Sequence, residues 1–181
     1  MPKPPPLPTE VLARVVRISG IDGRVLVFLA GGFGVLSALG ADWLGAAVGG
    51  LAAGAGLIEL RGRRRLQNSD ITGVRWLVRS QLILLAVVLS YAVYQYFTYD
   101  PTQTLAKFEK LMADIQQSSG MEPFSMAQSL GMSPAEFQTM LKRWVHQTYF
   151  AVGFGTVLCQ GGLAYYYHLK GAIIARHLRK S

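Results

Sequence analysis

The sequence predicts an all-α integral membrane protein with four transmembrane helices. Three observations lead to this prediction. Of the 181 residues, 51% are apolar and only 15% are charged, a composition typical of membrane proteins. The apolar residues form long runs, and the basic residues lie immediately beside them. A net charge of +8 with this distribution indicates the cytoplasmic face of a membrane and argues against nucleic-acid binding.

The expected order along the chain is a helical hairpin, two further spans, and a small helical extracytoplasmic insert between spans 3 and 4. A Pro-rich leader with an interfacial helix precedes the hairpin. The expected segments are the leader (1–24), the hairpin (25–60), a basic cytoplasmic loop running into span 3 (61–79), span 3 (76–97), the Met-rich insert (98–145), span 4 (146–169) and a basic cytoplasmic tail (170–181).

Residues 25–60 are rich in glycine and alanine and carry only two charged residues, Asp42 and Glu59. A single helix of this length would measure about 54 Å, whereas the hydrocarbon core of a bilayer is about 30 Å thick. We therefore expect two spans joined by a turn at residues 39–43. A cleaved secretory signal is the less favoured alternative for the first run, because the second run follows with almost no gap.

Small residues recur at intervals of four positions in three of the expected spans. In lipid, apolar burial does not drive helices together, and small residues allow close approach of their backbones. These stripes predict helix packing, either within the hairpin or against a second subunit. The predicted packing residues are Ala30, Gly34, Ala38, Gly45, Gly49, Ala53, Ala151, Gly155 and Cys159.

The N-terminal segment begins with five prolines in residues 2–8, which disfavour a helix there. Apolar residues then recur at helical spacing from Thr9 to Ser19. This pattern predicts a short amphipathic helix, lying either in the headgroup layer or against the cytoplasmic side of the protein. We expect Gly20 and Gly23 to end this helix and to allow a turn into the membrane.

Clustered arginines follow the hairpin and predict an anchor for the cytoplasmic ends of the spans. A binding pocket for a lipid headgroup or another anion is the alternative. Glu59 precedes Arg63 by four residues, so we expect an ion pair between them and not a proton-carrying site. The candidate headgroup or anion ligands are Arg61, Arg63, Arg64, Arg65, Arg75 and Arg79.

Polar residues gather near the outer end of span 3. Tyr91, Tyr94 and Gln95 share roughly one helix face. The simpler interpretation is an aromatic belt at the membrane interface with a polar contact to a neighbouring helix. The alternative is a polar vestibule lined by these three side chains.

The insert at 98–145 carries clear helix-start signals. Asp100 precedes Pro101, and Ser133 to Glu136 forms a capping box. Nothing interrupts the helical pattern after the capping box, so we expect this helix to continue into span 4. Five methionines lie here, but their spacing groups no thioethers on one face, which favours packing over Cu(I) binding. Those methionines are Met112, Met121, Met126, Met132 and Met140.

All but four of the 18 lysines and arginines flank the apolar runs on one predicted side. The exceptions, Lys107, Lys110, Lys142 and Arg143, lie in the insert. The distribution predicts that both termini are cytoplasmic, in a cell membrane such as the bacterial inner membrane.

Catalytic signatures are absent from the sequence. His146 falls on the predicted outer side and His168 and His177 on the inner side, so they cannot form one site. No hydrolase or metalloprotease motif and no cysteine pair is present. We expect no enzymatic activity, cofactor or metal. The expected function is self-association or partner binding in a membrane with anionic headgroups, and the alternative is a channel or carrier for an ion or small solute.

Overall fold

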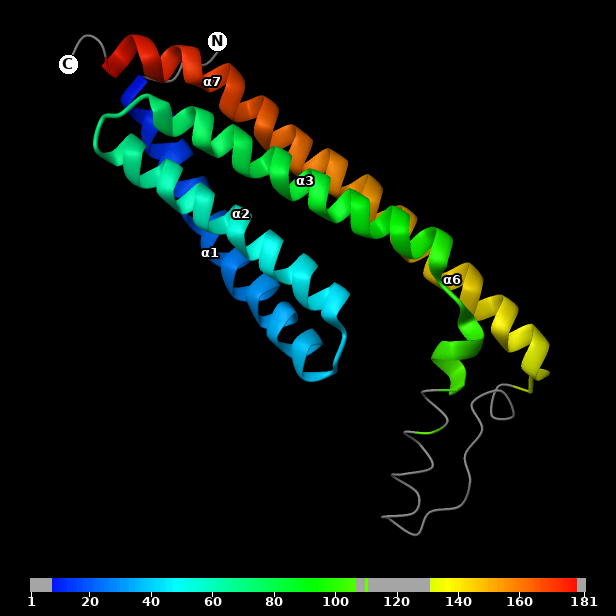
Figure 1. The fold of residues 1–181 in the computed structure, drawn as a ribbon. Coiled ribbons are helices and arrows are strands. Elements are labelled where there is room, and N and C mark those ends of the chain that lie inside the picture. The colour runs from blue at the N-terminus through cyan, green and yellow to red at the C-terminus, as the bar shows by residue number, and fades with distance from the viewer. Residues whose placement is uncertain (1–7, 107–109, 111–130, 179–181) are drawn as a thin grey trace, which may run out of the picture. The chain divides into compact units, whose positions relative to one another are not determined.

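The structure is a computed structural model that describes residues 8–106, 110 and 131–178. Every element assigned within these residues is helical, as predicted (Figure 1). The methionines at positions 112, 121 and 126 lie outside the described residues. In chain order the elements are α1 (Pro8–Leu39), α2 (Trp43–Gln67), α3 (Thr72–Thr98), α6 (Pro134–Thr156), a π-helical turn η1 (Val157–Gly161) and α7 (Gly162–Leu178).

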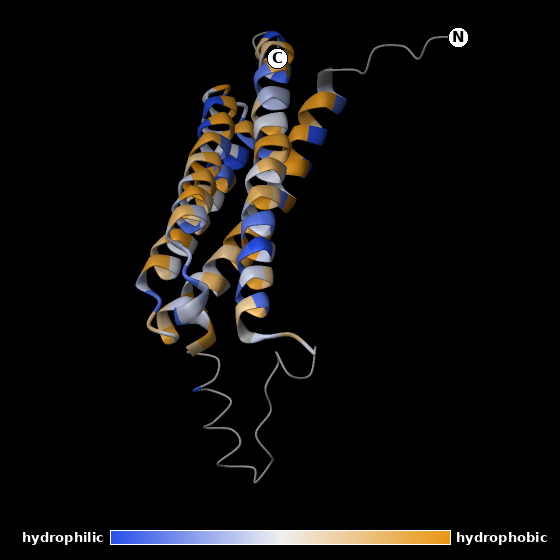
Figure 2. Cartoon of the chain, turned by 90° about the vertical axis from the view of Figure 1, so that its right-hand side faces the viewer, coloured by the Kyte–Doolittle hydropathy of each residue, from blue (hydrophilic) through white to orange (hydrophobic). Residues whose placement is uncertain are grey.

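Helices α1, α2 and α3 are long and apolar enough to cross a membrane. Their 32, 25 and 27 residues exceed the roughly 20 residues that a span of about 30 Å requires. Apolar residues cover much of their length (Figure 2). The fourth predicted span, residues 146–169, is helical, but it is not among the three candidate spans. The count of four therefore stays a prediction.

The chain divides into two compact units, which we describe separately. The first comprises Met1–Tyr91 with Gly153–Ser181, and the second comprises Ala92–Val152.

Helices α1 and α2 of the first unit form the predicted hairpin. Helix α1 ends at Leu39, and Asp42 caps α2 by accepting a hydrogen bond from the backbone N–H of Gly45 at 3.0 Å. The two backbones approach closely at Gly34 and Gly49. A Cβ atom added to Gly49 would lie 2.6 Å from the Gly34 Cα and 2.8 Å from the Ala30 carbonyl oxygen. Only glycine fits at this crossing.

The predicted turn at Gly20 and Gly23 is wrong, because α1 is one continuous helix from Pro8 to Leu39. These glycines instead make room for α2. A Cβ at Gly20 would lie 2.7 Å from the Nε of Arg63, and one at Gly23 would lie 3.0 Å from a methyl carbon of Leu60. The close packing offsets the helix-propensity cost of about 1 kcal/mol for each glycine. Pro8 occupies the first helical position, where proline is tolerated.

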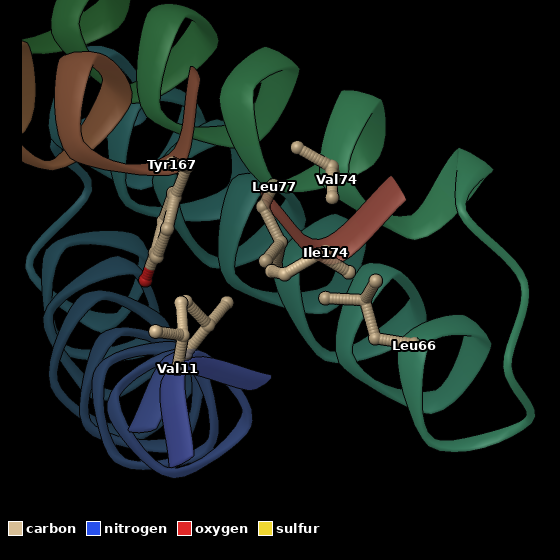
Figure 3. Close-up of a cluster of buried hydrophobic side chains, with 7 residues drawn as sticks. Val11, Leu66, Val74, Leu77, Tyr167 and Ile174 are labelled. Carbon is tan, nitrogen blue, oxygen red and sulfur yellow. The ribbon is translucent and has the colours of Figure 1, made fainter. Parts of the chain in front are cut away.

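One end of the first unit holds a hydrophobic core built from four helices (Figure 3). Helices α1, α2, α3 and α7 each contribute at least one buried side chain to it. A second, smaller cluster joins Ala52 and Ala55 of α2 to Leu84 of α3. The main core consists of Val11, Val15, Leu66, Val74, Leu77, Tyr167 and Ile174.

The second unit confirms the predicted helix starts. Asp100 accepts hydrogen bonds from the backbone N–H and hydroxyl of Thr102 at 2.9 and 2.6 Å, and residues 101–106 are helical. Ser133 and Glu136 form the reciprocal capping box at 2.9 and 3.3 Å. These hydrogen bonds lower the pKa of the Asp100 and Glu136 carboxyls, because they stabilise the ionised form. His146 stacks on Tyr96 with ring centroids 4.4 Å apart.

Residues 134–178 are helical without interruption, which confirms the predicted continuation of this helix. One turn, Val157–Gly161, is π-helical. Such turns interrupt the regular α-helical hydrogen bonding by one residue and often occur at functional positions.

Candidate functional site

Four polar side chains meet inside the first unit, each from a different helix. They are Asp22 of α1, Glu59 of α2, Gln81 of α3 and Tyr167 of α7, and we call them the polar cluster. Glu59 and Gln81 are 0% exposed and Tyr167 is 1% exposed, whereas Asp22 is half-buried. An ionisable residue enclosed in a membrane-spanning segment is a default candidate for function.

Two hydrogen bonds connect the polar cluster. The hydroxyl of Tyr167 donates to Oε1 of Glu59 at 3.1 Å, and the amide of Gln81 donates to Oδ2 of Asp22 at 3.1 Å. The Asp22 carboxyl also lies close enough to Glu59 to act on it electrostatically. All four helices of the first unit are therefore connected through polar groups. In a low-dielectric interior such contacts are stronger than in water.

Two oxygen atoms of the polar cluster have no hydrogen-bond donor. They are Oε2 of Glu59 and Oε1 of Gln81, and both are buried. Buried polar atoms are almost always hydrogen-bonded, so each such atom calls for an explanation. The polar cluster thus has two acceptors without a donor and a pair of carboxyl groups close enough to interact electrostatically.

No cation balances these carboxyl groups within the described residues. The ion pair found there joins Arg65 to Asp70 at 3.4 Å, in the turn before α3. The predicted ion pair between Glu59 and Arg63 is wrong. Glu59 accepts a hydrogen bond from Tyr167, whereas the guanidinium of Arg63 packs against α1 at Gly20.

The surroundings of the polar cluster are closely packed. The hydroxyl of Ser80, beside Gln81, donates to the backbone carbonyl of Ala55 at 2.7 Å and is fully buried. Val15 and Leu77, 1% and 0% exposed, belong with Tyr167 to the main core. The polar cluster is therefore embedded in apolar packing, where an uncompensated charge is costly.

The predicted basic residues lie in three settings. Arg61 and Arg64 are exposed on α2, and Arg63 is half-buried. Arg65 pairs with Asp70 and lies over the Trp76 ring at 5.1 Å. The remaining two, Arg75 and Arg79, line a groove between α3 and α7 together with His168.

The predicted packing residues are only partly brought together. Gly34, Gly49 and Ala30 meet at the hairpin crossing, and Gly45 lies buried beside the turn. Ala38 and Ala53 are half-buried in the same hairpin. In the later stripe, Ala151 and Cys159 are exposed, and no atom lies within 4 Å of a Cβ added to Gly155. A packing function for Ala151, Gly155 and Cys159 stays a prediction.

The three residues for which a polar vestibule was the alternative interpretation share α3 but belong to different units. Tyr91 closes the first unit, and Tyr94 and Gln95 belong to the second. Tyr94 is 51% exposed, and Tyr91 and Gln95 are half-buried. A vestibule at this position stays a prediction.

Sequence reasoning missed the polar cluster because α1 was divided at Gly20. Val11, Val15, Ser19 and Asp22 follow one another at intervals of four, four and three residues, which places them on one face of a continuous helix. Val11, Val15 and Ser19 are all buried, and Asp22 extends this face toward Glu59. This periodicity was the available signal for Asp22.

No protein-family model, curated protein or solved structure matches this chain. The class of protein is therefore inferred from the fold and the contacts of this chain. It is an all-helical protein with three helices suited to membrane insertion, and a polar cluster lies where the candidate spans meet α7.

Proposed function

We propose that this protein is a carrier or channel whose working site is the polar cluster, and that the Asp22–Glu59 pair binds and releases a proton. The observation that carries the proposal is the fully buried carboxyl of Glu59, with one oxygen unpartnered and no cation paired with it in the described chain. Ionisable groups inside membrane spans commonly form proton relays.

A proton satisfies the chemistry of the polar cluster. Two carboxylates at one site repel each other, and a buried charge without a partner is costly. Protonation of one carboxyl removes that charge and supplies the O–H donor that the free acceptors on Glu59 and Gln81 lack. Within the described residues no three His, Cys, Asp or Glu side chains are grouped as metal ligands, which favours a proton over a multidentate metal ion.

The two members of the pair differ in burial, which supports a proposed exchange of the proton through Asp22. Glu59 is enclosed, whereas Asp22 is half-buried on α1. Asp22 is thus the more accessible member of the pair, and Glu59 is the member enclosed by contacts with Tyr167 and Gln81. A proton taken up at Asp22 has a neighbouring carboxyl to move to.

The test is proton flux into liposomes that contain the purified full chain, followed with an enclosed pH-sensitive dye under an imposed potential. We expect Glu59→Gln to reduce the flux to that of protein-free liposomes, because glutamine cannot exchange a proton. The matched control is Glu136→Gln, which removes the same charge from the exposed capping box.

Equal flux in wild type and Glu59→Gln, or no flux from folded wild type, would contradict the proposal. Flux that needs a sodium gradient and not a proton gradient would also contradict it, since it would assign the polar cluster to a metal cation.

Self-association is the second candidate function. One observation favours it: nothing lies within 4 Å of a Cβ added to Gly50, Gly54 or Gly155, so these small-residue positions stay uncovered among the described residues. Small residues of this kind accept a close-packed partner helix in lipid. The mass of the particle in nanodiscs tests it. An oligomer is expected for an associating protein, and a monomer would remove this candidate.

We further propose four spans, with residues 146–169 as the fourth and with both termini in the cytoplasm of a cell membrane. Tyr167 within that segment is buried against the hairpin, and the basic residues favour one side. A reporter fused after Ser181 is expected to face the cytoplasm. An external reporter would contradict this orientation. The function proposed is non-catalytic.

A further inference from the structure

A groove of about 580 Å³ runs between the start of α3 and the middle of α7, within the first unit. Small residues on α7 create the space, and Val74 of α3 closes the contact by packing against Gly171, whose added Cβ would lie 2.9 Å from a Val74 methyl carbon. The lining consists of Ile71 in the turn before α3, of Thr72, Val74, Arg75, Val78 and Arg79 on α3, and of His168, Gly171, Ala172 and Ala175 on α7.

Three basic side chains line this groove. Arg75 and Arg79 lie one helical turn apart on α3, and His168 faces the groove from α7. No acidic residue lines the groove. Both arginines are exposed and neither forms an ion pair in the described part of the chain, in contrast to Arg65, which is held by Asp70. Their charge is therefore available to an anion.

Apart from Thr72, the rest of the lining is apolar, which distinguishes the groove from a site for a free ion. Val74 and Val78 follow the same side of α3 as the two arginines, and Ile71 lies just before the helix. The groove also lies in the first two turns of a candidate span, which is the level at which lipid headgroups meet a membrane helix. Basic pockets between membrane helices on the cytoplasmic side are known to hold anionic headgroups.

We propose that this groove is a specific site for one anionic phospholipid, whose phosphate lies between Arg75, Arg79 and His168 and whose acyl chain follows the apolar wall of α3. The site is separate from the polar cluster. A negative result in the proton-flux experiment would therefore not contradict the lipid site.

Native mass spectrometry of the full chain released from detergent, titrated with phosphatidylglycerol, tests the proposal. We expect Arg75→Gln/Arg79→Gln to weaken lipid binding about 30-fold, since each charge near a headgroup contributes about 1 kcal/mol. The matched control, Arg61→Gln/Arg64→Gln, removes the same charge from exposed positions outside the groove. It is expected to change binding less than twofold.

A second variant tests the groove without altering its charge. Ala172→Phe places a large ring in the groove, and we expect it to displace the lipid while circular dichroism stays unchanged. Equal weakening by both arginine pairs would overturn the proposal, because it would show diffuse surface attraction. Binding of phosphatidylcholine as tight as that of phosphatidylglycerol, or of inorganic phosphate in place of the lipid, would also overturn it.

Discussion

Single residues set the turns between the helices of the first unit. Ala41 has a φ of 58°, in the left-handed region that favours glycine, and it lies between the end of α1 and the capping residue Asp42. At the next turn Asp70 accepts hydrogen bonds from the backbone N–H and the hydroxyl of Thr72, both at 2.8 Å. Asp70 thereby caps the start of α3.

Replacing Ala41 with glycine is expected to stabilise the hairpin. Alanine in the left-handed conformation costs about 1–2 kcal/mol, part of which glycine loses again through greater freedom of the unfolded chain. A net gain of about 0.5–1 kcal/mol is expected from unfolding in mixed micelles. A loss of stability would show that the turn does not hold this conformation.

The Asp70 cap gives the protein a defined dependence on acid. Hydrogen bonds from Thr72, assisted by Arg65, lower the pKa of Asp70 below its usual value of 3.8. A lowered pKa contributes stability at higher pH that is lost as pH falls through the lowered value. We expect Asp70→Asn to reduce stability at neutral pH and to flatten the acid limb of the stability curve below about pH 4. If Asp70→Asn leaves the acid limb of the stability curve unchanged, the loss of stability in acid is due to other carboxyl groups.

At the scale of elements, the hairpin depends on which face of each helix carries the glycines. Gly49 and Gly50 are adjacent in sequence but differ in surroundings. A Cβ at Gly49 would collide with the α1 backbone, whereas a Cβ at Gly50 would meet nothing within 4 Å. The stripe of small residues that contains Gly49 therefore packs inside the hairpin, and the stripe that contains Gly50 is uncovered.

This difference supplies a matched pair of variants. Gly49→Val is expected to cost about 3 kcal/mol or more, because the α1 backbone must move away. Gly50→Val changes the same atoms on the open face and is expected to change stability by less than about 1 kcal/mol. Unfolding in mixed micelles measures both. Equal costs would mean that the two helices cross elsewhere.

Local signals explain which elements could be predicted from sequence. The hairpin turn, the Asp100 start and the Ser133–Glu136 capping box all depend on residues within a few positions of one another. The continuity of α1 could not be read in this way, because glycine marks both helix ends and close helix contacts. Gly20 and Gly23 could be assigned only once α2 was in place.

The same limit applies to the candidate site. The polar cluster joins Glu59 to Tyr167 across 108 residues and Asp22 to Gln81 across 59. Of these four residues, the sequence singled out only Glu59, and the i+4 rule favoured Arg63 as its partner. Local spacing gave no reason to pair Glu59 with Tyr167 or Asp22 with Gln81.

At the scale of the molecule, the first unit combines apolar packing with the polar cluster, to which four helices contribute. The hairpin packs through glycines, and α3 and α7 join it through the main core and the polar cluster. A purely structural bundle does not need the polar cluster, because a protein with apolar side chains of similar volume at these positions is often equally stable. Its presence supports a function that uses a buried carboxyl.

The most direct test of the polar cluster is a double-mutant cycle between Glu59 and Tyr167, in which the free energy of unfolding is measured in mixed micelles. Glu59→Met and Tyr167→Phe each leave a buried partner unsatisfied, at a cost of about 1–3 kcal/mol. The double variant is expected to lose at least about 1 kcal/mol less than the sum of the two single losses. Losses that add within about 0.3 kcal/mol would show that α2 and α7 do not meet at these residues, and they would contradict the polar cluster as described.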